Sequence, residues 1–265
     1  MMRAKKHLGQ HFLNSPRTIE AMLHAAQLSK DDTVFEIGPG KGALTETLLQ
    51  TAGRVIALEK DAELLPHLAE RFEDSLSNDS LQLIEGDVRD TELLAKTIAR
   101  EKNYKVIANI PYYLTGQFFR TFLEMEQQPA SITVLIQKEV AERIVARNGK
   151  QSLLSIAISA FGTATYVCTV AARYFSPPPK IDSAVIHINN INHDHFKNPT
   201  AQEHFFEVLH VGFAHKRKTL AHNLRLKYPR EVVDAALLKL NTPPQIRAEE
   251  CEIDFWLQLA DSLEL

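Results

Sequence analysis

Cysteine is scarce in this sequence, and no residue pattern in it is typical of a metal site. Two cysteines occur in 265 residues, Cys168 and Cys251, and neither belongs to a Cys-x-x-Cys motif or has a histidine at ligand spacing. A disulfide framework and a zinc site of the usual spacing are therefore excluded, and no metal is expected. Unpaired thiols are typical of a reducing compartment, so we expect a cytoplasmic protein.

We expect neither a secretory signal nor a membrane span. The first residues of the sequence are basic, but no long apolar stretch follows them. One uncharged stretch, residues 151–172, contains seven Gln, Ser or Thr residues, and β-branched residues crowd its second half. This pattern predicts a buried helix followed by a strand, so no membrane partner is expected.

Positive charge is not in excess, with 30 Lys and Arg against 33 Asp and Glu and a formal net charge of −3. Taken alone, this total argues mildly against a nucleic-acid partner, because phosphate binding needs local positive charge. The total hides two opposite blocks, however. Residues 210–230 carry six Lys or Arg and no acid, whereas residues 249–264 carry six acids and no Lys or Arg.

Short β-rich runs alternate with amphipathic stretches up to about residue 190. Apolar strands separated by single helices predict βαβ units on a mostly parallel sheet, hence an α/β fold. The expected strands are residues 33–37, 54–59, 81–85, 104–108, 132–137, 164–172 and 184–188. Polar turn formers follow, so we expect a domain over residues 1–190 with a basic arm at 1–15, a linker at 191–200, and a small all-helical domain over 201–265.

A glycine-rich loop follows the first expected strand and opens a helix. Gly38 and Gly40 allow the backbone to turn tightly and to approach a ligand closely. Glu59 ends the second strand, where a carboxylate can accept hydrogen bonds from both hydroxyls of a ribose. NAD and S-adenosylmethionine both fit this pattern, and a turn that binds no ligand is the third interpretation.

Two acidic residues favour S-adenosylmethionine. Glu36 directly precedes the glycines, where a carboxylate would repel a pyrophosphate but not a sulfonium ligand that carries an amino group. Asp87 ends the third strand, where its side chain can bind an adenine amino group while the backbone at Val88 holds the ring. An aspartate at this place is often only a turn former.

A tetrapeptide that can bind an exocyclic amine, Asn109-Ile110-Pro111-Tyr112, follows the fourth strand. Asn109 offers a side-chain carbonyl, and Pro111 restrains Ile110 to an extended conformation that can present its backbone carbonyl. Two acceptors side by side can hold an –NH2 group while its lone pair stays free, and Tyr112 offers a flat face for a base. Most of the catalysis would then come from two effects: the hydrogen bonds draw the amine toward tetrahedral geometry, and the amine is placed in line with a sulfonium methyl group.

The chain resembles the KsgA/RsmA family of ribosomal RNA adenine N6-dimethyltransferases almost from end to end. The matching segments are residues 6–13, 36–45, 59, 87, 109–112, 137–140, 175–185, 213–220 and 247–249. The resemblance implies a Rossmann-like S-adenosylmethionine-dependent methyltransferase with a seven-stranded sheet, whose seventh strand is usually antiparallel. It implies N6,N6-dimethylation of two adjacent adenosines near the 3′ end of small-subunit (16S) rRNA, with a role in small-subunit biogenesis.

The resemblance also assigns site residues. The implied cofactor-binding residues are His11, Leu13, Gly38, Gly40, Glu59, Asp87, Val88 and Asn109; the implied catalytic residues are Asn109, Ile110, Pro111, Tyr112 and Phe175. Phe175 would stack on a flipped adenine as a second aromatic face. The alternative for Phe175 is a core residue packed under the triple proline. His11 stands where the family usually has Asn, and Lys216-Arg217-Lys218-Thr219 replaces the usual Arg-Arg-Lys-Thr.

For a protein of this family, the basic block is expected to bind RNA. The expected RNA-binding residues are Lys5, Lys6, Lys216, Arg217, Lys218 and Arg225. The expected partners are small-subunit rRNA and the assembling 30S subunit, and the expected state is a monomer. Three alternatives stay open: a 23S rRNA adenine methyltransferase of the resistance type, a DNA adenine methyltransferase, and a non-catalytic assembly or binding factor on the same fold.

Overall fold

The structure is a computed structural model that describes Lys5, residues 9–101 and residues 103–263. It divides into two compact units. The sheet unit comprises the chain up to Ala141 together with Thr163–Ile191, and the helical unit comprises Glu142–Gly162 and Asn192–Leu265. This boundary, between Ile191 and Asn192, falls inside the predicted linker of residues 191–200. The predicted domain over residues 1–190 did not include the excursion of residues 142–162 into the helical unit, because periodicity along the chain does not say which unit a helix packs against.

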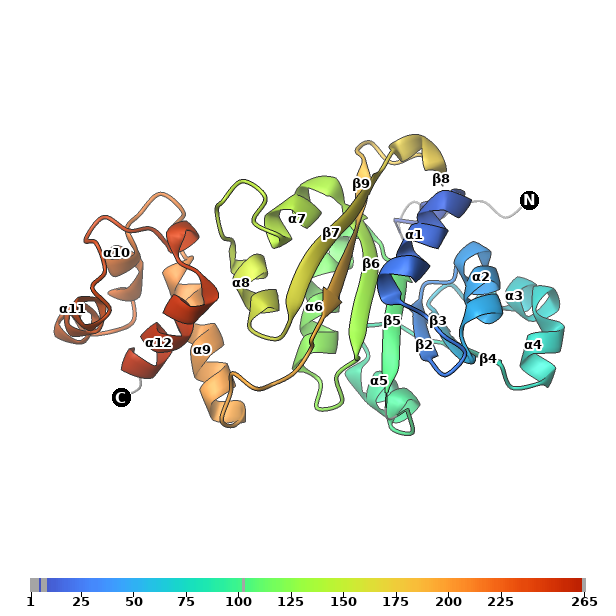
Figure 1. Ribbon diagram of the computed structural model, residues 1–265, viewed down its shortest axis with the longest axis horizontal. Coiled ribbons are helices and arrows are strands. Elements are labelled where there is room, and N and C mark those ends of the chain that lie inside the picture. Colours follow the sequence, from blue (N-terminus) through green and yellow to red (C-terminus); the bar gives the residue numbers. More distant parts are fainter. Residues whose placement is uncertain (1–4, 6–8, 102, 264–265) are drawn as a thin grey trace. The chain divides into compact units, whose positions relative to one another are not determined.

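A mixed sheet of seven strands forms the centre of the sheet unit within the described residues (Figure 1). Its order is β4-β3-β2-β5-β6-β9-β7, with β9 antiparallel to both neighbours and the first five strands parallel. The strands are β2 (Thr33–Ile37), β3 (Arg54–Glu59), β4 (Leu81–Glu85), β5 (Tyr104–Asn109), β6 (Ser131–Gln137), β7 (Thr163–Val170) and β9 (Ser183–Asn189). The predicted mostly parallel sheet and its antiparallel last strand are thus confirmed.

Helices cover both faces of this sheet, which explains why its central strands are mostly apolar and buried. Val34 belongs to the core cluster that includes Met22 of α1, whereas the next residue, Phe35, contacts the Phe122 ring of α6 at 6.1 Å between centroids. Successive strand residues point to opposite faces, so both faces of β2 are buried. The helices of this unit are α1 (Pro16–Ala26), α2 (Ala43–Thr51), α3 (Leu65–Arg71), α4 (Glu73–Ser77), α5 (Thr91–Ile98), η2 (Tyr112–Leu114), α6 (Thr115–Glu124) and η3 (Ala172–Tyr174).

Local sequence signals fix where several helices begin. Ser15 caps α1 by accepting a hydrogen bond from the Thr18 amide, and Pro16 occupies the first turn. Pro66 lies in the first turn of α3, which begins at Leu65, and a proline is tolerated at this place in a helix. A further small sheet pairs β1 (Phe12–Leu13) with β8 (Phe175–Ser176) in antiparallel register.

The helical unit packs around one tryptophan. Trp256 is fully buried, stacks on Phe213 at 5.3 Å between centroids, and lies so near Gly212 that a Cβ there would be 2.3 Å from its ring. The helices of this unit are α8 (Leu153–Ser159), α9 (Pro199–Gly212), α10 (Leu220–Leu224), α11 (Arg230–Lys239), η4 (Ala248–Glu250) and α12 (Ile253–Leu263), while α7 (Lys138–Ile144) runs across the boundary between the units.

The uncharged stretch 151–172 folds as its pattern predicted. It forms α8 followed by β7, and no described helix of the chain is long and apolar enough to cross a membrane. The basic block of residues 210–230 does not lie on a single helix. Helix α10 has only five residues, with Thr219 capping it and Arg225 already beyond its last turn.

Candidate active site

A cleft of about 820 Å³, counted with its open mouth, lies at the carboxyl ends of β2 to β5. Parallel strands end at one edge of a sheet, so the loops that follow them meet there, and open α/β sheets bind ligands at this edge. The structure brings most of the predicted site together in the lining of this cleft: His11, Gly38, Gly40, Glu59, Asp87, Val88, Asn109, Ile110, Pro111 and Tyr112.

The glycine loop after β2 has the backbone that its composition predicted. Gly38 and Gly40 have φ angles of 72° and 60°, in the left-handed region that glycine adopts without strain. A Cβ on Gly40 would lie 2.9 Å from the Phe12 ring, so a side chain there would displace β1. The loop therefore offers bare backbone to the cleft at Gly38 and Gly40, and the Phe12 ring packs against Gly40.

Glu59 is held in place by backbone donors. Its Oε2 accepts the Gly40 amide at 3.0 Å and its Oε1 accepts the Asp61 amide at 2.8 Å. The side chain is 6% exposed, and burial raises the pKa of this carboxyl above its ordinary value, against the lowering effect of those hydrogen bonds. A fixed carboxylate with free lone pairs in a nucleoside-sized cleft suits the two hydroxyls of a ribose.

Glu36 supplies a test of which ligand the cleft fits. The residue is fully buried; its Oε2 accepts from the Thr45 hydroxyl at 2.7 Å, whereas its Oε1 has no hydrogen-bond partner among the described residues. Burial raises the pKa of Glu36 to about 8. This pKa leaves the group largely protonated at neutral pH; a cationic sulfonium and ammonium nearby would favour its ionised form, whereas a phosphate would disfavour it. The residues present fit S-adenosylmethionine better than a dinucleotide.

Asp87 already binds two cations, which the sequence had not indicated. Arg89 donates to both carboxylate oxygens, at 2.6 to 3.0 Å, and Lys60 Nζ lies 3.0 Å from Oδ2. These groups hold the pKa of Asp87 well below its usual range. The carboxylate is ionised and oriented at the cleft, and an adenine amino group would share it with Arg89 and Lys60. Neither cation belongs to a motif, so only the fold could find them.

Asn109 is oriented as a hydrogen-bond acceptor. Its Nδ2 donates to the main-chain oxygen of His11 at 3.1 Å, which assigns the amide and leaves the side-chain oxygen as the acceptor. Next along the chain, Pro111 has an extended ψ of 134° and begins the turn η2. The Tyr112 hydroxyl shares a 2.7 Å hydrogen bond with Ser183 Oγ, and burial raises the pKa of this phenol. The tyrosine is thus fixed and uncharged, as a stacking surface should be.

His11 bridges the arm, the Pro-rich loop and Tyr112. Its ring is stacked on that of Tyr112, at 5.9 Å between centroids and 23° between planes. Nδ1 lies 2.8 Å from the Pro177 carbonyl oxygen, and because a carbonyl only accepts, Nδ1 carries the proton. The histidine at this position keeps a polar atom, Nε2, for the cleft.

Leu13 and Phe175 are not brought to the cleft. They pair with each other across β1 and β8, and both lie in the core cluster at 5% and 3% exposure. The prediction that Phe175 stacks on the base is therefore corrected to the alternative considered for it, a core residue. An aromatic that the sequence reasoning missed, Tyr113, lines the cleft and is 59% exposed. Its position directly after the Asn-Ile-Pro-Tyr motif was the available signal.

The predicted RNA-binding residues divide into three groups. Lys216, Arg217 and Lys218 are exposed on the loop before α10, whereas Arg225 forms an ion pair with Asp234. Lys5 forms ion pairs with Asp61 and Glu63 beside the cleft, so its charge is not simply presented to solvent. Lys6 lies outside the described residues. No cluster of metal ligands occurs among the residues that the structure describes.

The whole chain is similar to proteins of one known family. Residues 1–265 match the family model described as "Ribosomal RNA adenine dimethylase". The chain belongs to this family. It is 38% identical over 260 residues to "Ribosomal RNA small subunit methyltransferase A" of Dehalococcoides mccartyi (strain CBDB1), covering 97% of this chain and 88% of that one. It is 35% identical over 273 residues to the protein of that name from Synechococcus elongatus, with 99% and 96% covered.

Two solved structures extend the comparison. A dimethyladenosine transferase from Plasmodium falciparum superposes with a TM-score of 0.78 at 26% identity, covering 94% of this chain and 96% of that one. The 23S rRNA methyltransferase ErmE gives 0.75 at 25% identity, with 96% and 100% covered. The adenine dimethylase family therefore accounts for the whole chain, and the cleft is the candidate active site of a methyltransferase that modifies ribosomal RNA.

Proposed function

We propose that this rRNA adenine dimethylase transfers methyl groups from S-adenosylmethionine to N6 of two adjacent adenosines near the 3′ end of small-subunit rRNA. The product is N6,N6-dimethyladenosine, made during small-subunit biogenesis. The observation that carries the proposal is the acceptor geometry of Asn109, whose amide nitrogen is tied to His11 while its oxygen stays available in the cleft. The names of the relatives supply the ribosomal subunit.

Different residues of the chain would bind different parts of the cofactor. Glu59 would accept hydrogen bonds from the ribose hydroxyls, Asp87 and the backbone at Val88 would hold the adenine, and the loop at Gly38 and Gly40 would lie along the amino-acid part. When bound, S-adenosylmethionine supplies a methyl group on a positively charged sulfur. The buried carboxyl of Glu36 beside the loop matches the charge of this ligand.

Asn109 and Ile110 are the acceptors for the target amine. Their two oxygens would accept the N6 hydrogens and draw the nitrogen toward tetrahedral geometry, which frees the lone pair that the purine ring otherwise delocalises. Tyr112, fixed by Ser183 and by the His11 ring, provides the face on which the base stacks. No general base is needed, because an alkylated amine releases its proton readily to water. A monomethylated amine keeps one N–H, so one acceptor still holds it for the second transfer.

The basic loop of residues 216–218 is proposed to contact RNA phosphates. Phosphate binding through such residues makes association depend steeply on salt. The acidic groups around the cleft would repel phosphates from the cofactor position and so favour the intended ligand there. We propose further that the enzyme acts as a monomer in the cytoplasm on the assembling 30S subunit.

One second candidate is favoured by a specific observation. The fold similarity to the 23S rRNA methyltransferase ErmE is nearly as high as that to the dimethyladenosine transferase, so the large-subunit rRNA is the competing substrate.

A direct test offers labelled S-adenosylmethionine and the purified chain to small and large ribosomal subunits that both lack adenine dimethylation. The proposal expects label in adenine of the small subunit and none in the large one. Label confined to large-subunit rRNA would establish the second candidate, and label in neither would leave the chain as a non-catalytic binding factor.

A further inference from the structure

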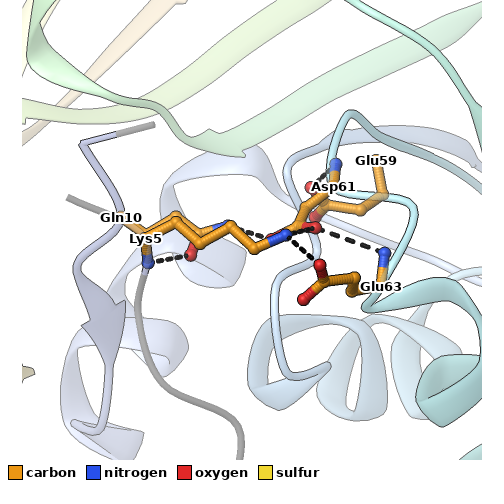
Figure 2. Close-up of polar contacts among 5 residues, drawn as sticks. All are labelled: Lys5, Gln10, Glu59, Asp61 and Glu63. Atoms are coloured by element: carbon orange, nitrogen blue, oxygen red, sulfur yellow. Dashed lines mark hydrogen bonds and ion pairs between the residues drawn. The ribbon is translucent and has the colours of Figure 1, made fainter. Parts of the chain in front are cut away.

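An ion-pair network joins the N-terminal arm to the loop after β3 (Figure 2). The ammonium nitrogen of Lys5 lies 2.7 Å from Asp61 Oδ1 and 3.0 Å from Glu63 Oε1. Gln10 completes the contact, since its Nε2 donates to Asp61 Oδ2 at 2.9 Å and its Oε1 accepts the Lys5 amide at 2.8 Å. Both carboxylate oxygens of Asp61 therefore bind the arm.

The same aspartate is bonded to the cleft. The Asp61 amide donates to Glu59 Oε1 at 2.8 Å (Figure 2). Glu59 lines the cleft, and its Oε2 accepts the Gly40 amide. Asp61 is 5% exposed, so its contacts are made largely away from water, where charge-assisted hydrogen bonds are strong. Asp61 thus connects two groups, the arm and the ribose-facing carboxylate, that do not bond to each other.

The negative charges in this loop need a counter-ion, and Lys5 provides one. Three carboxylates, Glu59, Asp61 and Glu63, lie within five residues, and like charges this near repel one another. Lys60, inside the same segment, pairs with Asp87 on the cleft side. On the arm side the described cation is Lys5, in contact with two of the three carboxylates. Its removal would leave the nearly buried Asp61 beside Glu59 without a counter-ion, which is costly.

The arm beyond Lys5 forms part of the cleft wall. Residues 9–12 line the cleft, and the main-chain oxygen of His11 is the acceptor that orients Asn109. At its far end the arm is fixed by the β1–β8 pairing and by the Phe12 ring, which lies over Gly40 with Lys41 Nζ 4.8 Å above it. The wall-forming segment is therefore held at two points, β1 and the Lys5–Asp61 pair.

We propose that Lys5 and Asp61 are positioning residues that hold residues 9–12 against the nucleoside cofactor, so that the docking of this segment and cofactor binding stabilise each other. This inference rests on the proposed function, because it takes the ligand beside Glu59 to be that cofactor. The interpretation of Lys5 as an RNA phosphate contact is the competing one, and its two ion pairs within the protein argue against it.

Calorimetric titration of the full chain with S-adenosylhomocysteine tests the proposal. Lys5→Ala and Asp61→Asn should each weaken binding about tenfold, and the double variant should be no more than about twofold weaker than either, because residues of one network are not additive. Lys5→Arg, which keeps the charge, should remain within about threefold of the wild type. Lys96→Ala is the matched control; it removes an ion pair to Glu92 of the same 2.7 Å length on exposed α5 and should change nothing.

The opposing outcomes are distinct. Unchanged affinity in Lys5→Ala, with a slope of RNA binding against salt reduced by about 0.7 to 0.9, would make Lys5 a phosphate contact and overturn the inference. A lower unfolding temperature with unchanged affinity would reduce the pair to a structural role and overturn it as well. If the wild type itself binds no S-adenosylhomocysteine, the proposed function fails rather than this inference alone.

Discussion

The Asn109→Ala substitution separates the catalytic role of this side chain from its structural one. The variant loses a neutral 3.1 Å hydrogen bond to His11, which contributes about 1 kcal/mol to stability. It also loses an acceptor aimed at charge that develops on the amine during transfer. Removing one such preorganised group costs about 100- to 1000-fold in kcat, or roughly 2.7 to 4 kcal/mol. We therefore expect a large loss of kcat with a small loss of unfolding free energy.

Single-turnover methyl transfer to small subunits, urea unfolding and RNA filter binding measure the three quantities. RNA affinity should stay within about threefold, because Asn109 is no phosphate contact. Asn148→Ala is the control: that exposed asparagine also takes part in one 3.1 Å hydrogen bond, with the Lys150 amide, but is not among the residues that line the cleft, and the kcat of this variant should not change. A kcat for Asn109→Ala within about fivefold of the wild type would refute the acceptor mechanism, because the expected loss is at least about 100-fold.

Three further predictions concern other parts of the chain. Gly42→Ala should lower the free energy of unfolding, measured by urea denaturation, by about 2 to 4 kcal/mol, since φ is 83° and the new Cβ would lie 2.6 Å from the Phe72 ring. Gly149→Ala is the control: its φ of 73° is similar but its surroundings are open, so it should lower the free energy of unfolding by only about 1 kcal/mol. Because the folded-state pKa of Glu36 is about 8 against 4.5 for the ordinary group, wild-type stability should fall relative to Glu36→Gln as pH rises from 4.5 to 8; a parallel pair of pH profiles would contradict this. Alanine at all three positions 216–218 should reduce the salt slope of RNA binding by about 2, and an unchanged slope would exclude them as phosphate contacts.

The fold was largely predictable because strand patterning here is strong. The parallel strands β2, β3 and β5 are mostly buried on both faces and are each followed by a loop that contains glycine or polar residues, so their apolar runs and their ends are visible in the sequence. The carboxyl ends of parallel strands lie at the same edge of a sheet. The sequence alone therefore predicts that Gly38, Glu59, Asp87 and Asn109 lie in one cleft.

What could not be predicted depends on packing between distant segments. The burial of Phe175 follows from its pairing with Leu13, and a motif does not say whether an aromatic side chain faces a ligand or the core. The pairing of Lys5 with Asp61 spans 56 positions, and charge counting treats such a lysine as an exposed one. The same reason hid Arg89 and Lys60 at Asp87, since ion pairs have no sequence period.

The most direct measurement of the central claim is nucleoside mass spectrometry of small-subunit rRNA after reaction with this enzyme and S-adenosylmethionine. Primer extension on the same RNA locates the modified positions. We predict N6,N6-dimethyladenosine at two adjacent adenosines near the 3′ end with the wild type, and little or none in the same time with Asn109→Ala. Wild-type rRNA without dimethyladenosine, or equal yield from the Asn109→Ala enzyme, would contradict the account.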